Sequence, residues 1–251
     1  MNKIIITIGM LVWLQFITGC ASSGKKHETD FVKASQINVQ LGAEYLARNK
    51  LNLAKDKLEK ALEQNPDNAL AHSTMALLLE NVGQHEDVIE HYEEAMSLDP
   101  SNSDIKNNYG TYLCNQSRFD EAQKLFKMAI NDPYYRTHTV ALVNAGQCAM
   151  NNSRYDLAER YLRKALRKNP KLAKALYSMA LLGIKSKKYL MTRAYIQRYH
   201  DVARHSAESL WVQIRAEKAL GDTVHMSKLI QTLNIKFPDS NEAGLAMGLV
   251  R

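Results

Sequence analysis

The chain has 251 residues, of which 45% are hydrophobic, and a formal net charge of +7 at pH 7. Beyond an apolar N-terminal run, roughly 220 residues remain, which is enough for one large or two small domains. The sequence contains no HExxH, CxxC, GxSxG or glycine-rich phosphate loop, which argues against the enzyme classes that depend on these motifs.

The N-terminal segment has the parts of a secretory signal. A basic start at Lys3 precedes an apolar run from Ile4 to Ile17, and this run is shorter than the roughly 20 residues that span a bilayer. The sequence ITGC at residues 17–20 resembles the bacterial lipobox, in which the cysteine receives lipid. The resemblance implies a signal peptide over residues 1–19 and a mature chain that begins at lipidated Cys20.

The lipobox resemblance also implies a location. Three acyl chains on Cys20 anchor a protein to a membrane more firmly than a single chain does. The next residue is Ala21 rather than the aspartate that retains many Gram-negative lipoproteins at the inner membrane, so the periplasmic face of the outer membrane is expected. Residues 20–34 are expected to form a flexible tether, because the stretch SSGKKHET is small and charged without an apolar period.

Prolines mark an internal repeat in the rest of the chain. Pro66 and Pro100 are 34 residues apart, Pro170 and Pro238 are 68 apart, and Pro100 and Pro170 are 70 apart. One amphipathic pattern recurs in KDKLEKALEQNPDN, IEHYEEAMSLDPSN, AQKLFKMAINDPYY and AERYLRKALRKNPK. Each copy predicts a helix that stops at the proline, because proline cannot continue a helix.

The 34-residue pattern resembles the tetratricopeptide repeat, a helix-turn-helix unit with small residues where its two helices cross. The resemblance implies an all-α fold, a right-handed superhelical solenoid of about six units. The solenoid is expected over residues 35–238, with a two-residue insertion within 133–137. Residues 239–251 are expected to form a C-terminal cap or tail. The units are expected near residues 35–68, 69–102, 103–138, 139–172, 173–206 and 207–238.

The last two units depart from the repeat pattern. Thr192 and Tyr199 occupy small-residue positions in the fifth unit, and Ile214 replaces a small residue in the sixth. Looser or differently angled packing is therefore expected in these units.

The titratable residues do not form a catalytic or metal-binding pattern. The close histidine pairs, His85 with His91 and His200 with His205, are six and five residues apart, which does not place two imidazoles on one helical face. Acidic pairs lie in second-helix patterns where charge normally faces water. The sequence therefore predicts a non-enzymatic protein with no metal and no cofactor, apart from the covalent lipid on Cys20.

Two further cysteines, Cys114 and Cys148, lie in the first helices of adjacent repeats. An oxidising compartment favours a disulfide between them. Alternatively they are two small buried residues that do not meet, since their positions within the repeat differ by two. Both alternatives stay open at the level of the sequence.

Charge is distributed unevenly along the chain. Residues 150–251 carry 19 Lys and Arg against 8 Asp and Glu, a net charge of +11, whereas the preceding residues carry a net charge of −4. The imbalance indicates attraction to acidic protein or lipid head groups, against the alternative of an ordinary solvated helix face. Nucleic acid is not expected as a partner of an exported protein.

Comparison with the repeat family implies a groove lined by the first helix of each unit. The fifth position carries no lysine, so a clamp for peptide C-termini is not supported, and the apolar and amide lining suits an extended segment or a helix. Tyr177 and Trp211 are expected either to anchor a partner or to pack between repeats. The candidate groove residues are Val39, Ala43, Leu46, Asn107, Thr111, Val143, Gln147, Tyr177, Leu181 and Trp211.

The ordered combination of lipobox, tether and six repeats resembles the PilF/PilW family of type IV pilus biogenesis lipoproteins. The resemblance includes NNYGTYLC in the third repeat, VNAGQCA in the fourth and ESLWVQIRAEKALGD in the sixth. The resemblance implies a pilotin that binds the type IV pilus secretin and promotes its insertion and multimerisation in the outer membrane. A monomer is expected because it is the default for a capped solenoid. It implies contact with protein and, through the lipid, with membrane, but no small-molecule substrate. The alternative is a lipoprotein adaptor for other envelope machinery such as peptidoglycan synthases.

Overall fold

The computed structural model describes residues 23–249, with side chains described from residue 30 onward. Thirteen α-helices and no strand occur in this range, which confirms the all-α fold. No helix among these residues is long and apolar enough to cross a membrane. The predicted signal peptide and Cys20 lie outside the described residues.

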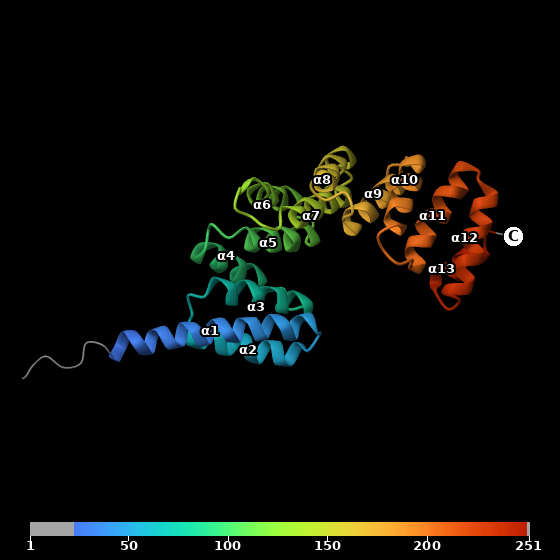
Figure 1. The fold of residues 1–251 in the computed structure, drawn as a ribbon. Coiled ribbons are helices and arrows are strands. Elements are labelled where there is room, and N and C mark those ends of the chain that lie inside the picture. The colour runs from blue at the N-terminus through green and yellow to red at the C-terminus, as the bar shows by residue number, and fades with distance from the viewer. Residues whose placement is uncertain (1–22, 250–251) are drawn as a thin grey trace, which may run out of the picture. The chain divides into compact units, whose positions relative to one another are not determined.

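The chain divides into two compact units, residues 1–99 and 100–251. The first unit contains α1 (Ser23–Ala47), α2 (Leu51–Gln64), α3 (Ala69–Asn81) and α4 (Val88–Leu98), which pack as the pairs α1 with α2 and α3 with α4 (Figure 1). The boundary between the two compact units lies between Asp99 and Pro100, and one continuous solenoid over residues 35–238 stays a prediction.

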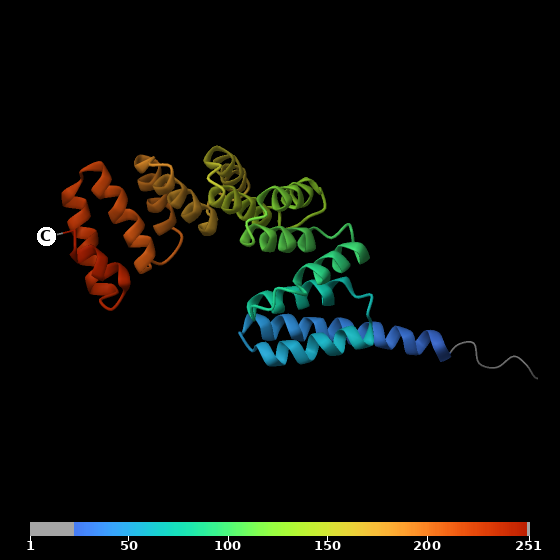
Figure 2. The ribbon, with the colours of Figure 1, turned by 180° about the vertical axis from the view of Figure 1, so that it is seen from behind.

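The second unit contains nine of the described helices. In the view from behind they follow one another from green to red as antiparallel pairs, and a short last helix covers the end (Figure 2). The helices are α5 (Ser103–Asn115), α6 (Phe119–Asn131), α7 (His138–Asn151), α8 (Tyr155–Lys168), α9 (Ala173–Lys185), α10 (Tyr189–His200), α11 (Ala207–Leu220), α12 (Thr223–Lys236) and α13 (Asn241–Met247).

A left-handed residue closes the first helix of every repeat. These residues have φ between 54° and 76°, and successive ones are 34 residues apart except for one interval of 36 that spans the predicted insertion. Glycine adopts this conformation without strain, whereas other residue types pay a steric cost. The spacing confirms the repeat register across all six units, in the residues Asn49, Gly83, Ser117, Ser153, Lys187 and Gly221.

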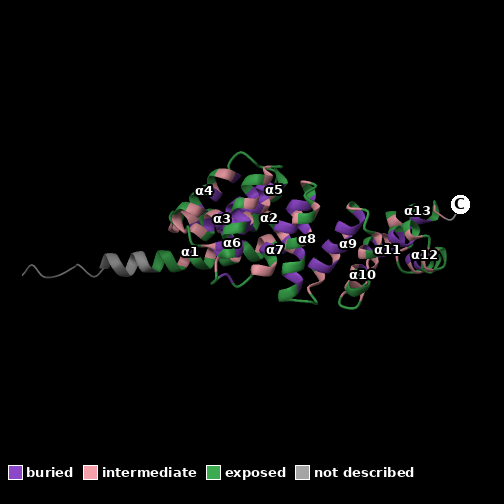
Figure 3. Ribbon diagram, turned by 90° about the horizontal axis from the view of Figure 1, so that it is seen from above, coloured by how far each residue is buried: buried purple, intermediate pink, exposed green. Residues whose placement is uncertain are grey.

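The first four repeats bury small residues where their two helices cross. A β-carbon placed on Gly146 would lie 2.8 Å from Leu162 Cγ and 3.4 Å from the carbonyl oxygen of Ala158, so α7 and α8 approach too closely for a larger residue. Buried residues alternate with exposed ones along the helices, and the loops between helices are largely exposed (Figure 3). Tyr92, Tyr112 and Phe126 are the largest fully buried side chains.

Helix α1 corrects the prediction of a flexible tether over residues 20–34. It begins at Ser23, twelve residues before the first repeat. The segment from Lys25 to Ala34 contains no proline and includes several good helix formers. Because α1 is already fixed by its packing on α2, extending it backwards needs no new nucleation.

Helix α4 begins three residues later than the repeat pattern predicts. The second helices of the first, third and fourth repeats begin at the apolar or aromatic residues Leu51, Phe119 and Tyr155, but the equivalent position here is His85. A polar residue there gives no burial energy to the first turn. Helix α12 also begins at a polar residue, Thr223, but the side chain of Asp222 caps it, whereas α4 has no side-chain cap. The connection between α3 and α4 is therefore the longer loop 82–87.

The fifth repeat accommodates a larger residue, Thr192, at a position where its two helices cross. Thr192 is fully buried, and its hydroxyl donates to the carbonyl oxygen of Ala180 at 3.1 Å. Space for it comes from Gly183, which stands where other units have Tyr45, Leu79 or Leu113. The predicted looser packing is therefore wrong at this crossing.

The end of the chain is a cap. Ser240 lies 34 residues after Ser206, and both side chains accept a hydrogen bond from the first turn of the following helix. Helix α13 is thus a shortened first helix of another unit. It buries Ala243 and Ala246 against the core of α11 and α12.

Candidate partner-binding face

Polar side chains link the first helices of three consecutive repeats in the second unit. Asn144 Nδ2, on α7, donates to Asn107 Oδ1 at 3.1 Å and to Thr111 Oγ1 at 3.4 Å, both on α5. Lys174 Nζ, on α9, donates to Asn144 Oδ1 at 3.2 Å. The contacts run from α5 through α7 to α9.

A second set of bonds joins α7 to α9 on the same face. Gln147 Nε2 donates to Ser178 Oγ at 3.0 Å, and Ser178 Oγ donates to the backbone oxygen of Lys174 at 2.8 Å. We call the combined set the polar ladder, which consists of Asn107, Thr111, Asn144, Gln147, Lys174 and Ser178.

The polar ladder has hydrogen-bonding capacity directed outward. Gln147 and Asn144 are half-buried, and Lys174 is exposed. The bond to Asn144 uses one of three ammonium N–H groups of Lys174, and the bond to Ser178 leaves the amide oxygen of Gln147 as an acceptor. Amide groups that both donate and accept match the peptide units of an extended chain.

Three of the candidate groove residues are buried, and the side chains of Val39 and Val143 are therefore not available for contact with a partner. Val39 packs with Ala61 and Ala71 in a core cluster, and Val143 is fully buried. Asn107 is also buried, but its amide belongs to the polar ladder. The fifth position of these first helices faces neighbouring helices rather than solvent, so the family pattern does not transfer to it.

The aromatic candidates pack between helices. Tyr177 and Leu181 are half-buried against the core of α9 to α11, and the Tyr177 ring lies 5.3 Å from that of Tyr199. Burial raises the pKa of Tyr177. Trp211 packs on the C-terminal core and is also half-buried. The remaining candidates, Ala43 and Leu46, lie on α1 in the first unit, where Ala43 is exposed.

The sequence missed Asn144, Lys174 and Ser178. Asn144 and Ser178 occupy the sixth position of their first helices, one residue after the position that was compared with the family. A polar residue recurs there as Asn108, Asn144 and Ser178, and this recurrence was the available signal.

A disulfide joins the same first helices on which the polar ladder begins. Cys114 on α5 and Cys148 on α7 are bonded in the structure, with their Cα atoms 5.8 Å apart, inside the range that disulfides adopt. The difference of two repeat positions therefore does not keep the two sulfur atoms apart. The bond fixes the first helices of the third and fourth repeats to one another.

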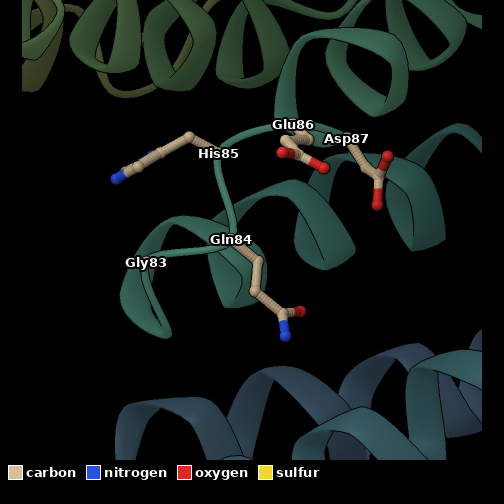
Figure 4. Close-up of a pocket in the computed structure, with 5 residues that line it drawn as sticks. All are labelled: Gly83, Gln84, His85, Glu86 and Asp87. Atoms are coloured by element: carbon tan, nitrogen blue, oxygen red, sulfur yellow. The ribbon is translucent and has the colours of Figure 1, made fainter.

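The loop between α3 and α4 forms a shallow hollow in the first unit, lined by Gly83 to Asp87. Its side chains point in different directions rather than towards a common point (Figure 4). Among the described residues, no group of three or more His, Cys, Asp or Glu is placed to hold a metal ion. The hollow therefore offers no converging acid and base, and the polar ladder remains the better candidate site.

A histidine pair lies where α10 meets α11. The rings of His200 and His205 stack with centroids 4.1 Å apart, and His200 Nε2 lies 3.1 Å from Ser209 Oγ. Burial, with a smaller contribution from the charge of His205, lowers the pKa of His200 to about 4, and Asp201 and a hydrogen bond with Gln213 act in the opposite direction. Burial also lowers the pKa of His205, with Lys236 adding to the effect.

The stability of the second unit is expected to fall in mild acid. A depressed histidine pKa favours folding above the unfolded value near 6.5, and this contribution is lost as the pH falls from 6.5 towards 4. The urea midpoint should therefore drop less between pH 7.5 and pH 5 in His200→Gln than in the wild type. His138→Gln, outside the pair, should keep the full drop. Equal drops in all three proteins would contradict the assignment.

Comparisons with known proteins agree with the repeat architecture. A tetratricopeptide-repeat family model matches residues 57–90 and 91–124, and a second such model matches residues 143–190. The type IV pilus assembly protein PilF of Pseudomonas aeruginosa is 31% identical over 210 residues, which cover 82% of this chain and 83% of PilF. An uncharacterized protein of Haemophilus influenzae is 34% identical over 144 residues, covering 57% of this chain and 78% of that protein.

Two solved structures share the fold over nearly their whole length. The crystal structure of PilW, described as a widely conserved type IV pilus biogenesis factor, has a TM-score of 0.81 and 28% identity, and covers 85% of this chain and 98% of PilW. The structure of Pseudomonas aeruginosa PilF has a TM-score of 0.75 and 28% identity, and covers 88% of this chain and 99% of PilF. The chain therefore belongs to the PilF/PilW family of tetratricopeptide-repeat proteins of type IV pilus biogenesis.

Proposed function

We propose that this protein is a pilotin, an outer-membrane lipoprotein that binds the type IV pilus secretin and promotes its insertion and multimerisation. Family membership supports the proposal most strongly, because the shared fold covers almost the whole of PilF and PilW. The proposed anchor is a lipid on Cys20, in the lipobox-like sequence ITGC. No bond chemistry is needed for this role.

The polar ladder is the proposed contact with the secretin. Its amide and ammonium groups suit the backbone of an extended secretin segment, and the disulfide between α5 and α7 holds two of its three helices in place. Anchoring such a face at the membrane raises the local concentration of bound subunits, so multimerisation follows from proximity.

A complementation experiment tests the proposal. A strain lacking the gene receives the wild type, Cys20→Ala or the control Ser22→Ala, and pili, secretin multimers and the abundance of this protein are measured. Cys20→Ala should lose most multimers and pili at unchanged abundance, whereas Ser22→Ala should restore both. Wild-type levels of both in Cys20→Ala would overturn the anchored mechanism.

A further inference from the structure

Exposed cations from three helices converge around the turn between α8 and α9. Arg167 and Lys168 end α8, Lys171 lies in the turn, and Lys174 begins α9. Arg198 on α10 joins them, because its Nη2 donates to the carbonyl oxygen of Pro170 at 3.2 Å. We call this set the cationic edge, which consists of Arg167, Lys168, Lys171, Lys174 and Arg198.

No residue of the cationic edge has a carboxylate partner among the described ion pairs, whereas Arg163, Lys188 and Arg193 nearby do. Arg163 and Lys188 both bind Glu159, at 2.7 Å and 3.1 Å, and hydrogen bonds from these two residues lower the pKa of that carboxyl. Arg193 pairs with the buried Glu217 and with Asp222. The carboxylates of Glu159, Glu217 and Asp222 are therefore already engaged by other cations, and none of them is paired with the cationic edge.

Helix dipoles account for only part of this cluster. A cation in the last turn of α8 or α10 is favourable there, because helix carbonyl groups give that end a partial negative charge. This effect acts on each helix separately and does not require the ends to meet at one turn. It also gives no reason for Lys171 and Lys174, which lie in the turn and at the start of α9.

The surroundings fit a polar, acidic partner. No large apolar side chain on α8, on α9 or in the turn between them is exposed, so this turn offers nothing to insert among lipid tails; on α10 and just after it, Leu190 and Val202 are exposed. Lys174 belongs both to the cationic edge and to the polar ladder, so the two surfaces are continuous. We propose that the cationic edge binds an acidic, Asp- and Glu-rich segment of a partner protein, whichever protein the polar ladder holds.

A binding titration tests this proposal on the full chain purified in detergent. The probe is a fluorescent 12-residue peptide of alternating glutamate and serine, followed by anisotropy at low and high salt. The variant Arg167→Glu, Lys168→Glu, Lys171→Glu should weaken binding at least about tenfold at low salt, since three attractive pairs become repulsive. The control Lys124→Glu, Lys127→Glu, Lys218→Glu changes the net charge equally at exposed positions elsewhere and should bind within about threefold of the wild type.

Two results would overturn the proposal. Equal losses in both triple variants would mean that net charge alone attracts the peptide. The second result is that the wild type binds vesicles of phosphatidylglycerol but not the peptide, and that the cationic-edge variant no longer binds the vesicles. This result would show that the cationic edge contacts membrane instead of protein. A second variant with glutamine at the same three positions should lose affinity to a smaller degree, and circular dichroism of all variants checks that they remain folded.

Discussion

Replacing Cys114 and Cys148 together by alanine is expected to lower the free energy of unfolding by about 2–4 kcal/mol. The bond closes a loop with a sequence separation of 34 residues, so it removes much of the freedom of the unfolded chain. Both residues are buried, so alanine also leaves a small gap in the packing between α5 and α7.

The measurement is urea unfolding of a chain that lacks residues 1–20, which removes the third cysteine. Reduced wild type is the informative control, because it keeps both sulfur atoms in the core and loses only the cross-link. It should account for most of the loss seen in the double variant. Two free thiols in the denatured, unreduced wild type would contradict the bonded structure.

Gly183→Ala is expected to destabilise the second unit by about 2 kcal/mol. A β-carbon at residue 183 would lie 2.3 Å from Thr192 Oγ1, 2.9 Å from Thr192 N and 3.0 Å from the carbonyl oxygen of Lys188. Two of these atoms are backbone, so α9 and α10 must move apart. Overpacking of this kind costs up to about 3 kcal/mol, of which the better helix propensity of alanine recovers about 1 kcal/mol.

Gly244→Ala provides the matched control. Gly244 also lies inside a helix, but a β-carbon there meets nothing within 4 Å, so this variant should be at least as stable as the wild type. Adding Thr192→Ala to Gly183→Ala should restore only part of the loss, because the backbone contacts remain. Thermal unfolding measures all four proteins, and a neutral Gly183→Ala would refute the close packing.

Local chemistry made the repeat predictable. Helix stops depend on nearby residues such as Pro66 and Pro170, so their spacing set the period before any tertiary contact was known. The insertion near Pro133 was predictable for the same reason, and the left-handed residues Ser117 and Ser153 lie 36 apart in the structure.

The candidate site was less predictable because it depends on contacts between repeats. Whether Val143 is exposed depends on the neighbouring first helices, and the family pattern does not specify how closely these pack. Asn144 could be identified as a site residue only from its hydrogen bonds to α5 and α9. Thr192 looked unfavourable in the sequence because its compensation lies at Gly183, outside the repeat signature.

Helix α1 shows a different limit. Periodicity identifies a helix by the face that it buries, and the residues before Ser35 were judged on the absence of such a face. The structure continues the helix through them from Ser23. A segment without an amphipathic face can still be helical when it extends a helix that is packed elsewhere.

Co-purification from detergent extracts tests whether this protein binds the secretin through the polar ladder. The wild-type protein should bring down the type IV pilus secretin, and Asn144→Leu with Gln147→Leu should bring down much less, because the polar ladder loses its amides. Asn151→Leu, an exposed amide at the end of α7, should behave as the wild type. Capture of a peptidoglycan synthase instead of the secretin would contradict the pilotin role. Undiminished capture of the secretin by the ladder variant would contradict binding through the polar ladder.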